Sequence, residues 1–592
     1  MKWSSDSKKT KMKTLMHAIM DILKHKGIPA LAWTFLFLTG AEPVQGQDPL
    51  KLEEIRVVAP YEPTISDAFK INLNPRLEDP EEIRLNFDYR VEPVKLVIPF
   101  VLEPISPARM RGEPLTKLYR GIVKGGYGSY STPFFEGHFN SLRSNRHALG
   151  VHLRHLSSGG GIEEVEESGY SDNLARLYGK KFLRSHTLEG DVRYERNMVH
   201  QYGIRPDLHE LHPGLFPGNT ETEADDIRQV FNRFSSELGF GSHRADSTRL
   251  RQQYRAGYHW LFDRYDAGEH HAWFRGHLGS PIRQDPFGMA DKQYFSLDAR
   301  AEYFNNRHRE DSLNTWLVSL QPRIWAQYGL FQFHLGVNTS FELDSVSYFR
   351  AYPLFGAEAN LVPGILVAHL GLSGQLEKHS LHSLTTANPF LNTSLGMKFM
   401  NTRSEVSGGI RGSLADFLSY KLTVRHASID NYAFFVTDTT GFLGNQFTVV
   451  YDDIRRFHAS GEVFARFHER FSTRLGLDYF QYGLTNEIEA WHAPTVQFSV
   501  NMKYNIQDKI ILTFDGFTRN EAFARMFDTE GNPTAVRLHG THLDANLGIE
   551  YRYTRLLSVF LQFNNLSNKP LDRWMNYPSQ GFNFLGGLSY SF

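Results

Sequence analysis

The segment FNFLGGLSYSF, Phe582–Phe592, decides the fold of this chain. One side of the segment carries Phe582, Phe584, Gly586, Leu588, Tyr590 and Phe592, and the other carries Asn583, Gly587, Ser589 and Ser591. A period of two predicts a β-strand with one apolar face. A final strand that ends in Phe, with aromatics and leucine at alternate positions, is typical of what the outer-membrane assembly machinery recognises. We therefore expect Phe584, Leu588, Tyr590 and Phe592 to form a barrel-assembly signal, and the chain to contact outer-membrane lipid.

The same alternation recurs from about residue 118 to the C-terminus. Apolar and polar residues alternate clearly in Phe295–Tyr303, Phe331–Val337, Val496–Tyr504 and Leu543–Tyr553. A soluble antiparallel sandwich alternates too, so period alone does not separate the two folds. The runs are about 9 to 14 residues long, as strands tilted across a bilayer require. Their length favours a transmembrane barrel.

The connections between these segments are of two kinds. Tight polar connections, such as Arg143–Arg146 and Gln507–Asp508, alternate with long loops. The long loops are Ser158–Asn173, Gly203–Asp226, Glu377–Arg403 and Asn520–Gly540. This layout predicts an all-β chain, a large antiparallel transmembrane β-barrel of about 22 strands (range 20–24) over residues 118–592. Ser280–Gln293 and Pro389–Arg403 lack a clear pattern, and each is either a loop or a hidden strand.

The composition excludes several classes of protein. The chain has 592 residues, with 64 Lys+Arg against 65 Asp+Glu, and no cysteine. Near-neutral charge gives no basic face for nucleic acid. Without cysteine there are no disulfides, thiolate zinc sites or Cys nucleophiles. A mean hydropathy of −0.39 is too polar for a bundle of membrane helices. The 14% aromatic content suits many short strands with one apolar face.

Residues 1–46 read as a signal peptide. Lys24, His25 and Lys26 precede the apolar run Ile28–Leu38, which is too short to span a bilayer. Val44 and Gly46 suit signal peptidase, so we expect cleavage after Gly46 and export. The other interpretation is a single membrane anchor.

The two ends of the chain resemble TonB-dependent receptors. At the C-terminus, the resemblance rests on Asn565–Leu566, on the aromatic loop with Trp574 and Tyr577, and on the closing strand to Phe592. Gly125–Pro133 resembles the first barrel strand and turn of such receptors. Near the mature N-terminus, EEIRVVA resembles a TonB box; its residues are Glu53, Glu54, Ile55, Arg56, Val57, Val58 and Ala59. The resemblance implies an outer-membrane receptor or transporter that binds or imports a solute, with TonB or another envelope protein as partner. EEIRVVA is equally readable as an edge strand.

One departure from that family lies in residues 47–117. This segment has only about half the length of the plug that fills a full receptor, and many prolines interrupt it. We expect a short plug-like, periplasmic or lumenal segment. It supports an alternative function, a non-transporting barrel that serves as a structural or assembly subunit of an outer-membrane complex.

Candidate chemistry is sparse. His209 and His212 lie three apart in one loop, and Glu269, His270 and His271 are adjacent in what reads as another. Neither has a fixed metal-ligand spacing, so solvated loop histidines are favoured and we expect no metal and no cofactor. No nucleophile motif such as GxSxG stands at a strand end, so we expect no enzyme and no catalytic residue.

The solute is not readable from the sequence. Ligand contacts are expected in the long loops and upper lumen, where Phe216, Phe390 and Trp491 are the candidate ligand-contacting residues. Residues predicted to face the lumen carry both signs of charge, which argues against a lumen specialised for a strongly charged solute.

Overall fold

The computed structural model describes residues 118–163, 165, 167–204, 223–242, 250–282, 291–308, 311–344, 346–441, 443–528 and 532–592. The predicted signal peptide (1–46) and the segment 47–117, with Glu53–Ala59, lie outside the described residues. No helix in the described part of the chain has the length and apolarity needed to cross a membrane.

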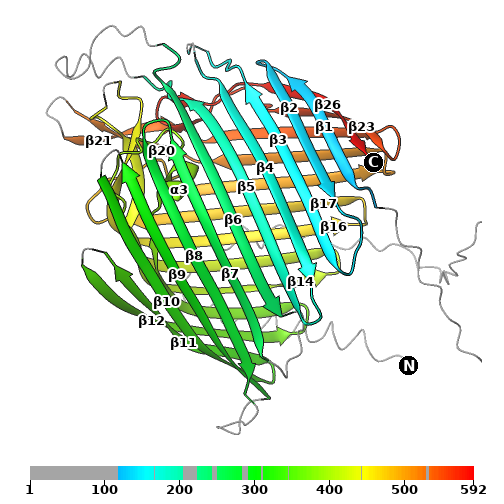
Figure 1. Ribbon diagram of the computed structural model, residues 1–592. Helices are drawn as coiled ribbons and strands as arrows, with labels where there is room; N and C mark the ends of the chain where they lie inside the picture. Colours follow the sequence, from blue (N-terminus) through cyan, green and yellow to red (C-terminus); the bar gives the residue numbers. More distant parts are fainter. Residues whose placement is uncertain are drawn as a thin grey trace, which may run out of the picture. The chain divides into compact units, whose positions relative to one another are not determined.

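Twenty-two antiparallel strands form one closed barrel. They are β1 (Gly121–Gly128), β2 (Thr132–Asn140), β3 (His147–Ser158), β4 (Tyr170–Phe182), β5 (His186–His200), β6 (Arg228–Ser242), β7 (Arg251–Asp263), β8 (Ala267–Pro281), β9 (Lys292–His308), β10 (Asp311–Tyr328), β11 (Phe331–Leu343), β12 (Ser347–Val362), β13 (Leu366–Lys378), β14 (Phe399–Ala415), β15 (Leu418–Thr437), β16 (Phe447–Phe467), β17 (Phe471–Gly483), β18 (Val496–Ile506), β19 (Ile510–Arg519), β22 (His542–Arg552), β23 (Leu557–Asn564) and β26 (Asn583–Ser591). Strand β1 pairs with both β2 and β26, which closes the ring and leaves no sheet edge (Figure 1). The predicted fold class and strand number are confirmed.

The remaining elements lie in the connections. They are β20 (Ala522–Phe527), β21 (Pro533–His539), β24 (Asp572–Trp574), β25 (Tyr577–Pro578) and the helix α3 (Leu381–Ala387). Strands β20 and β21 pair with each other, and so do β24 and β25. Within the described residues of the two unpatterned stretches, no extra barrel strand occurs. The first joins β8 to β9, and the second leads from α3 into β14.

The apolar side chains of the strands form the outer face of the barrel. In β26, Leu588 is 55% exposed while its neighbour Ser589 is 6% exposed. Phe331, Phe498 and Tyr551, from three other predicted sets, are also exposed, as expected for side chains that face lipid. Partners across strands continue the apolar surface, as in the pair Val559 and Leu588. The period of two thus follows from a wall with lipid on one side and a wet lumen on the other.

The two ends of the barrel differ. One, the turn rim, carries Phe592 and tight turns such as Gln507–Asp508, whose φ values of 50° and 56° match a type I′ hairpin turn. The other, the loop rim, carries the connections 201–227, 379–398, 520–541 and 565–582. The contrast is not uniform: the loop-rim connection 264–266 is short, whereas 282–291 on the turn rim is longer. The alternation predicted from the sequence therefore fails around β7 to β9, and also at the short loop-rim connections 129–131 and 344–346.

Candidate functional site

The connection from β13 to β14 folds inward and carries helix α3. Ser380 begins the helix: its Oγ accepts from the Ser383 backbone N (3.1 Å), and Ser383 Oγ accepts from the Ser380 backbone N (3.0 Å). This reciprocal pair satisfies two backbone donors at the helix start. Leu381 and Leu384, one turn apart, are both buried. This seven-residue helix, buried on one face, depends on its packing and its anchors, because so short a helix is marginal on its own.

The first anchor of the helix is Glu269, which projects inward from β8 and is 0% exposed. Its carboxylate accepts from the backbone N of Leu381 (2.8 Å) and of His382 (3.3 Å). Asn306 Nδ2 also donates to it (2.7 Å), and Lys378 Nζ donates to Asn306 Oδ1 (3.1 Å). A carboxylate is favourable at this position because the first amides of a helix carry partial positive charge. Glu269 therefore fastens α3 to the inner wall.

A second anchor joins the same loop to β6 and β7. Asp263, the last residue of β7, accepts from Thr393 Oγ1 (2.6 Å) and from Gln229 Nε2 (3.0 Å). Arg233 of β6 donates to Thr385 Oγ1 in α3 (3.1 Å). These groups are buried, so the hydrogen bonds offset the loss of their hydration.

The loop continues toward the far wall through apolar contacts. Leu384 and Leu391 pack in one buried cluster with Phe447, Trp574 and Tyr577. The rings of Phe390 and Tyr577 are stacked with centroids 3.8 Å apart. Phe447 begins β16, and the other two aromatics lie in the connection between β23 and β26. The loop between β13 and β14, which is anchored to β8 through Glu269, thus contacts two further sectors of the barrel.

His492 joins one more connection to this group. Its Nδ1–H donates to the Phe435 carbonyl (2.9 Å), while its Nε2 accepts from the Met575 backbone N (3.3 Å). Only a neutral imidazole has one donor and one acceptor nitrogen. Burial lowers the pKa of His492 to about 4, which agrees with that geometry. Tyr577 Oη donates to the Asn445 carbonyl, which ties the connection 438–446 to the same group. We call the four interlocked connections, 379–398, 438–446, 484–495 and 565–582, the loop cap.

A polar cavity of about 510 Å³ lies on the inner wall beneath α3. Strands β4 to β8 line it, with His382 contributed by the helix. Its charges are largely paired: Arg176 lies 2.6 Å from Asp191, and Lys180 lies 2.7 Å from Glu189. Trp273 adds an aromatic surface. Paired charges offer both hydrogen-bond donors and acceptors but produce little net electrostatic field. The cavity therefore suits a polar solute of low net charge.

The predicted ligand-contacting residues have three different locations. Phe390 is partly buried in the loop cap, stacked on Tyr577. Trp491 is 2% exposed, packs against Phe434 and Ile454, and donates from Nε1 to Glu487 (2.6 Å). Phe216 lies outside the described residues. Ligand contact at these three residues stays a prediction, and at Trp491 it requires the cap to move.

The other predicted residues divide similarly. Phe584, Leu588, Tyr590 and Phe592 all lie on the outer face, where recognition by the assembly machinery stays a prediction. His209 and His212 lie outside the described residues. The interpretation of Glu269, His270 and His271 as a loop cluster is wrong, because all three belong to β8 and Glu269 is fully buried. The signal that was missed is positional: Glu269 and His271 fall on the inward side of an alternating strand.

No family model matches this chain, and no curated protein matches it in sequence. Solved structures do match. The siderophore receptor PirA from Acinetobacter baumannii is 10% identical, with 81% of each chain covered and a TM-score of 0.58. The ferric-catecholate import receptor Fiu from E. coli K12 is 11% identical over 80% of this chain and 82% of the other, with a TM-score of 0.58. The FrpB iron transporter from Neisseria meningitidis is 9% identical over 81% and 82%, with a TM-score of 0.60.

The chain has the barrel fold of TonB-dependent receptors. The resemblance predicted from the ends of the sequence is confirmed at the level of the fold, with 22 strands in the barrel. At about 10% identity, these matches establish the fold and do not identify a ligand. The three structures described above are named as receptors or as a transporter, and the expectation that this chain is not an enzyme stays a prediction.

Proposed function

We propose that this protein is an outer-membrane receptor that binds a polar solute of low net charge beneath the loop cap and imports it. The observation that carries the proposal is the cap itself, a set of interlocked connections anchored by buried Glu269 and Asp263 over a polar cavity. A passive pore gains nothing from such an anchored cap. A receptor needs one, because binding must be coupled to a change in access.

The envelope orientation follows from the same proposal. Residues 1–46 direct export, the loop rim faces the outside, and the turn rim with Phe592 faces the periplasm. Residues 47–117 form a short plug-like segment. In it, Glu53–Ala59 pairs with TonB by strand addition, a mode in which backbone hydrogen bonds supply the affinity.

A photo-crosslinker at Arg56 tests this coupling in cells. We expect an adduct with TonB, identified by mass spectrometry, whose yield rises when the solute is supplied. The same crosslinker at Lys117, at the end of the plug-like segment, is the matched control and gives no TonB adduct. A deletion of Glu53–Ala59 abolishes uptake and leaves membrane assembly intact. Uptake that survives the deletion contradicts the receptor proposal.

The alternative function is that of a structural or assembly subunit that does not transport. The short segment 47–117 favours it, because a full plug is what TonB moves in a receptor. In that case the Arg56 crosslinker captures another envelope protein and no TonB. The deletion then changes the recovery of that partner and has no effect specific to a solute.

A further inference from the structure

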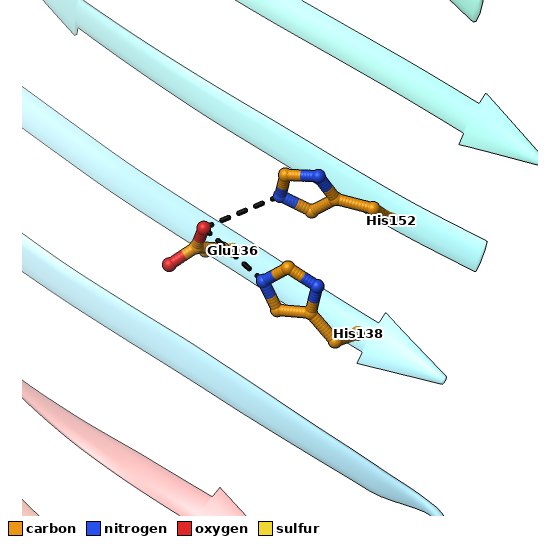
Figure 2. Close-up of side chains that lie close together, drawn as sticks. All are labelled: Glu136, His138 and His152. Carbon is orange, nitrogen blue, oxygen red and sulfur yellow. Dashed lines mark hydrogen bonds and ion pairs between the residues drawn. The ribbon is translucent and has the colours of Figure 1, made fainter. Parts of the chain in front are cut away.

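Three ligand-type side chains converge on the inner wall between β2 and β3. Glu136 Oε1 lies 3.2 Å from His138 Nε2 and 3.2 Å from His152 Nε2 (Figure 2). The two imidazole rings are stacked, with centroids 3.9 Å apart and planes inclined by 14°. Each ring presents its Nε2 to the same carboxylate oxygen, and the near-parallel rings must tilt for one ion to lie in the plane of both. Among the described residues, this is the one group of three or more His, Asp or Glu side chains with ligand atoms within 4.8 Å of one another.

The register of the sheet produces this convergence. His138 and His152 are direct partners across β2 and β3, and Glu136 precedes His138 by two residues on the same face. Side chains at directly opposed positions approach closely, and residues two apart on one strand share a face. Phe135 and Phe139, which flank Glu136 and His138 in β2, are exposed on the outer face. The sequence alone does not reveal the trio, because the two histidines are brought together only by pairing.

The donor set and its spacing fit a zinc ion. Zn²⁺ takes imidazole nitrogen and carboxylate oxygen at about 2.0–2.2 Å in a tetrahedral shell, so neighbouring ligand atoms are about 3.3–3.5 Å apart. The 3.2 Å separations are close to that edge length. Two imidazoles favour Zn²⁺ over Ca²⁺ or Mg²⁺, which prefer oxygen. Three protein ligands leave the fourth position for water or a solute group.

The neighbouring side chains orient the Glu136 carboxylate and limit the affinity of the three residues for a divalent ion. Lys124 Nζ lies 3.5 Å from Glu136 Oε2, so the other oxygen, Oε1, is the one turned to the histidines. Arg176, the cross-strand partner of His152, is paired with Asp191 at 2.6 Å. Lys124 on β1 and Arg154 on β3, the two cross-strand partners of Glu136, are thus the neighbouring cations that oppose a bound divalent ion by Coulomb repulsion.

We propose that Glu136, His138 and His152 bind one divalent ion of the zinc class on the lumen wall, near the turn rim. The site joins β2 to β3 beside the β1–β26 closure of the barrel. It shares no residue with the loop cap or with the cavity beneath α3, although Arg176 of the cavity wall is the cross-strand partner of His152. The proposal does not depend on whether the barrel imports a solute.

Zinc titration of the purified full-length protein in detergent, against a chromogenic chelator, tests the site. We expect one saturable Zn²⁺ per chain. Glu136→Gln and His152→Gln each weaken binding by about 10-fold or more, because each removes a ligand. The matched control is His277→Gln: His277 is another lumen histidine with a carboxylate partner, Asp298 at 2.7 Å. That variant binds zinc like the wild type.

A second variant separates a metal site from a hydrogen-bonded trio. Lys124→Gln removes one of the two opposing cations and is expected to tighten zinc binding by several-fold, an effect that no purely structural role produces. Heat-dependent gel mobility confirms that each variant forms the barrel. If a ligand variant fails to fold, X-ray absorption spectroscopy of zinc bound to the wild type identifies the ligands instead. We expect two imidazoles and a carboxylate oxygen. No zinc binding by the wild type, or unchanged binding in Glu136→Gln and His152→Gln, overturns the proposal.

Discussion

The outer face of β26 and the loop cap are built by different rules. On β26, Phe584, Leu588 and Tyr590 face outward at alternate positions, and each backbone group pairs with β1 or β23. In the cap, stability comes from single contacts between residues far apart in sequence, such as Glu269 with Leu381 and Asp263 with Thr393. The wall needs a class of residue at each position. The cap needs particular residues.

The difference shows which parts of this fold depend on the identity of particular residues. Lipid accepts any apolar side chain, so the outer face tolerates exchange among Leu, Val and Phe. A buried carboxylate has no such freedom, because removal of one partner leaves the others unsatisfied. Two kinds of substitution test this comparison. One places a polar or charged residue on the outer face of the wall, and the other removes one anchor of the cap.

The largest effect is expected at the C-terminus. Phe592→Ser removes the last aromatic of the outward series, whose ring packs 5.7 Å from that of Phe139. Most of the variant chain should fail to assemble, measured as the fraction with folded mobility in outer-membrane preparations. Ser591→Ala, one residue away on the other face, is the control and should assemble normally. Normal insertion of Phe592→Ser contradicts the assembly signal.

A charge on the outer face is the next test. Leu335 of β11 is 67% exposed on the lipid side. Leu335→Arg should lower the free energy of unfolding in lipid vesicles by about 2–4 kcal/mol, measured by urea titration, since the midplane disfavours arginine most. Gln332→Arg places the same charge on the inner face of the same strand and should cost far less. If the two variants lower the free energy of unfolding equally, the two faces of β11 do not differ in their surroundings.

The wall was predictable and the cap was not, for a physical reason. Strand length, period and the ending at Phe592 are local properties, and a lipid-facing wall imposes them on every strand. Glu269 reads locally as part of a histidine-rich loop, and only the β8–β9 register turns it toward α3. Trp491 reads as an exposed loop aromatic, yet it packs in a buried cluster with residues of β15 and β16.

The same reasoning applies to the metal-site proposal. Glu136, His138 and His152 are separated by up to 16 residues, and their spacing in the sequence matches no fixed metal-ligand motif. Their convergence follows from one hairpin register. A sequence pattern finds ligands that share a helix turn or a loop, whereas a barrel wall assembles them across strands.

A pH change should loosen the cap and leave the wall intact. His492 is buried and neutral, with its pKa lowered from about 6.5 to about 4. Its contribution is fully present above pH 6.5 and is lost as the pH falls toward 4, because the unfolded state takes up the proton first. At pH 5 the loss is about 2 kcal/mol.

Hydrogen exchange measures this loss. After correction for the intrinsic pH dependence, amides of residues 565–582 should exchange roughly 30-fold faster at pH 5 than at pH 7. His492→Gln retains a donor and an acceptor but has no titration in this range, so it should flatten the dependence. An unchanged pH dependence in that variant excludes His492 as the cause.

The most direct test of the account asks whether the cap closes the lumen at the loop rim. The chain has no cysteine, so Ser235→Cys places a single thiol in the cavity beneath α3. A polymer-linked maleimide applied to intact cells should label it slowly. Adding Glu269→Ala, which removes an anchor worth about 1–3 kcal/mol, should speed labelling roughly ten-fold. Glu189→Ala, a wall carboxylate paired with Lys180, should not. Fast labelling with the cap intact, or equal rates for the two carboxylate variants, would contradict the account.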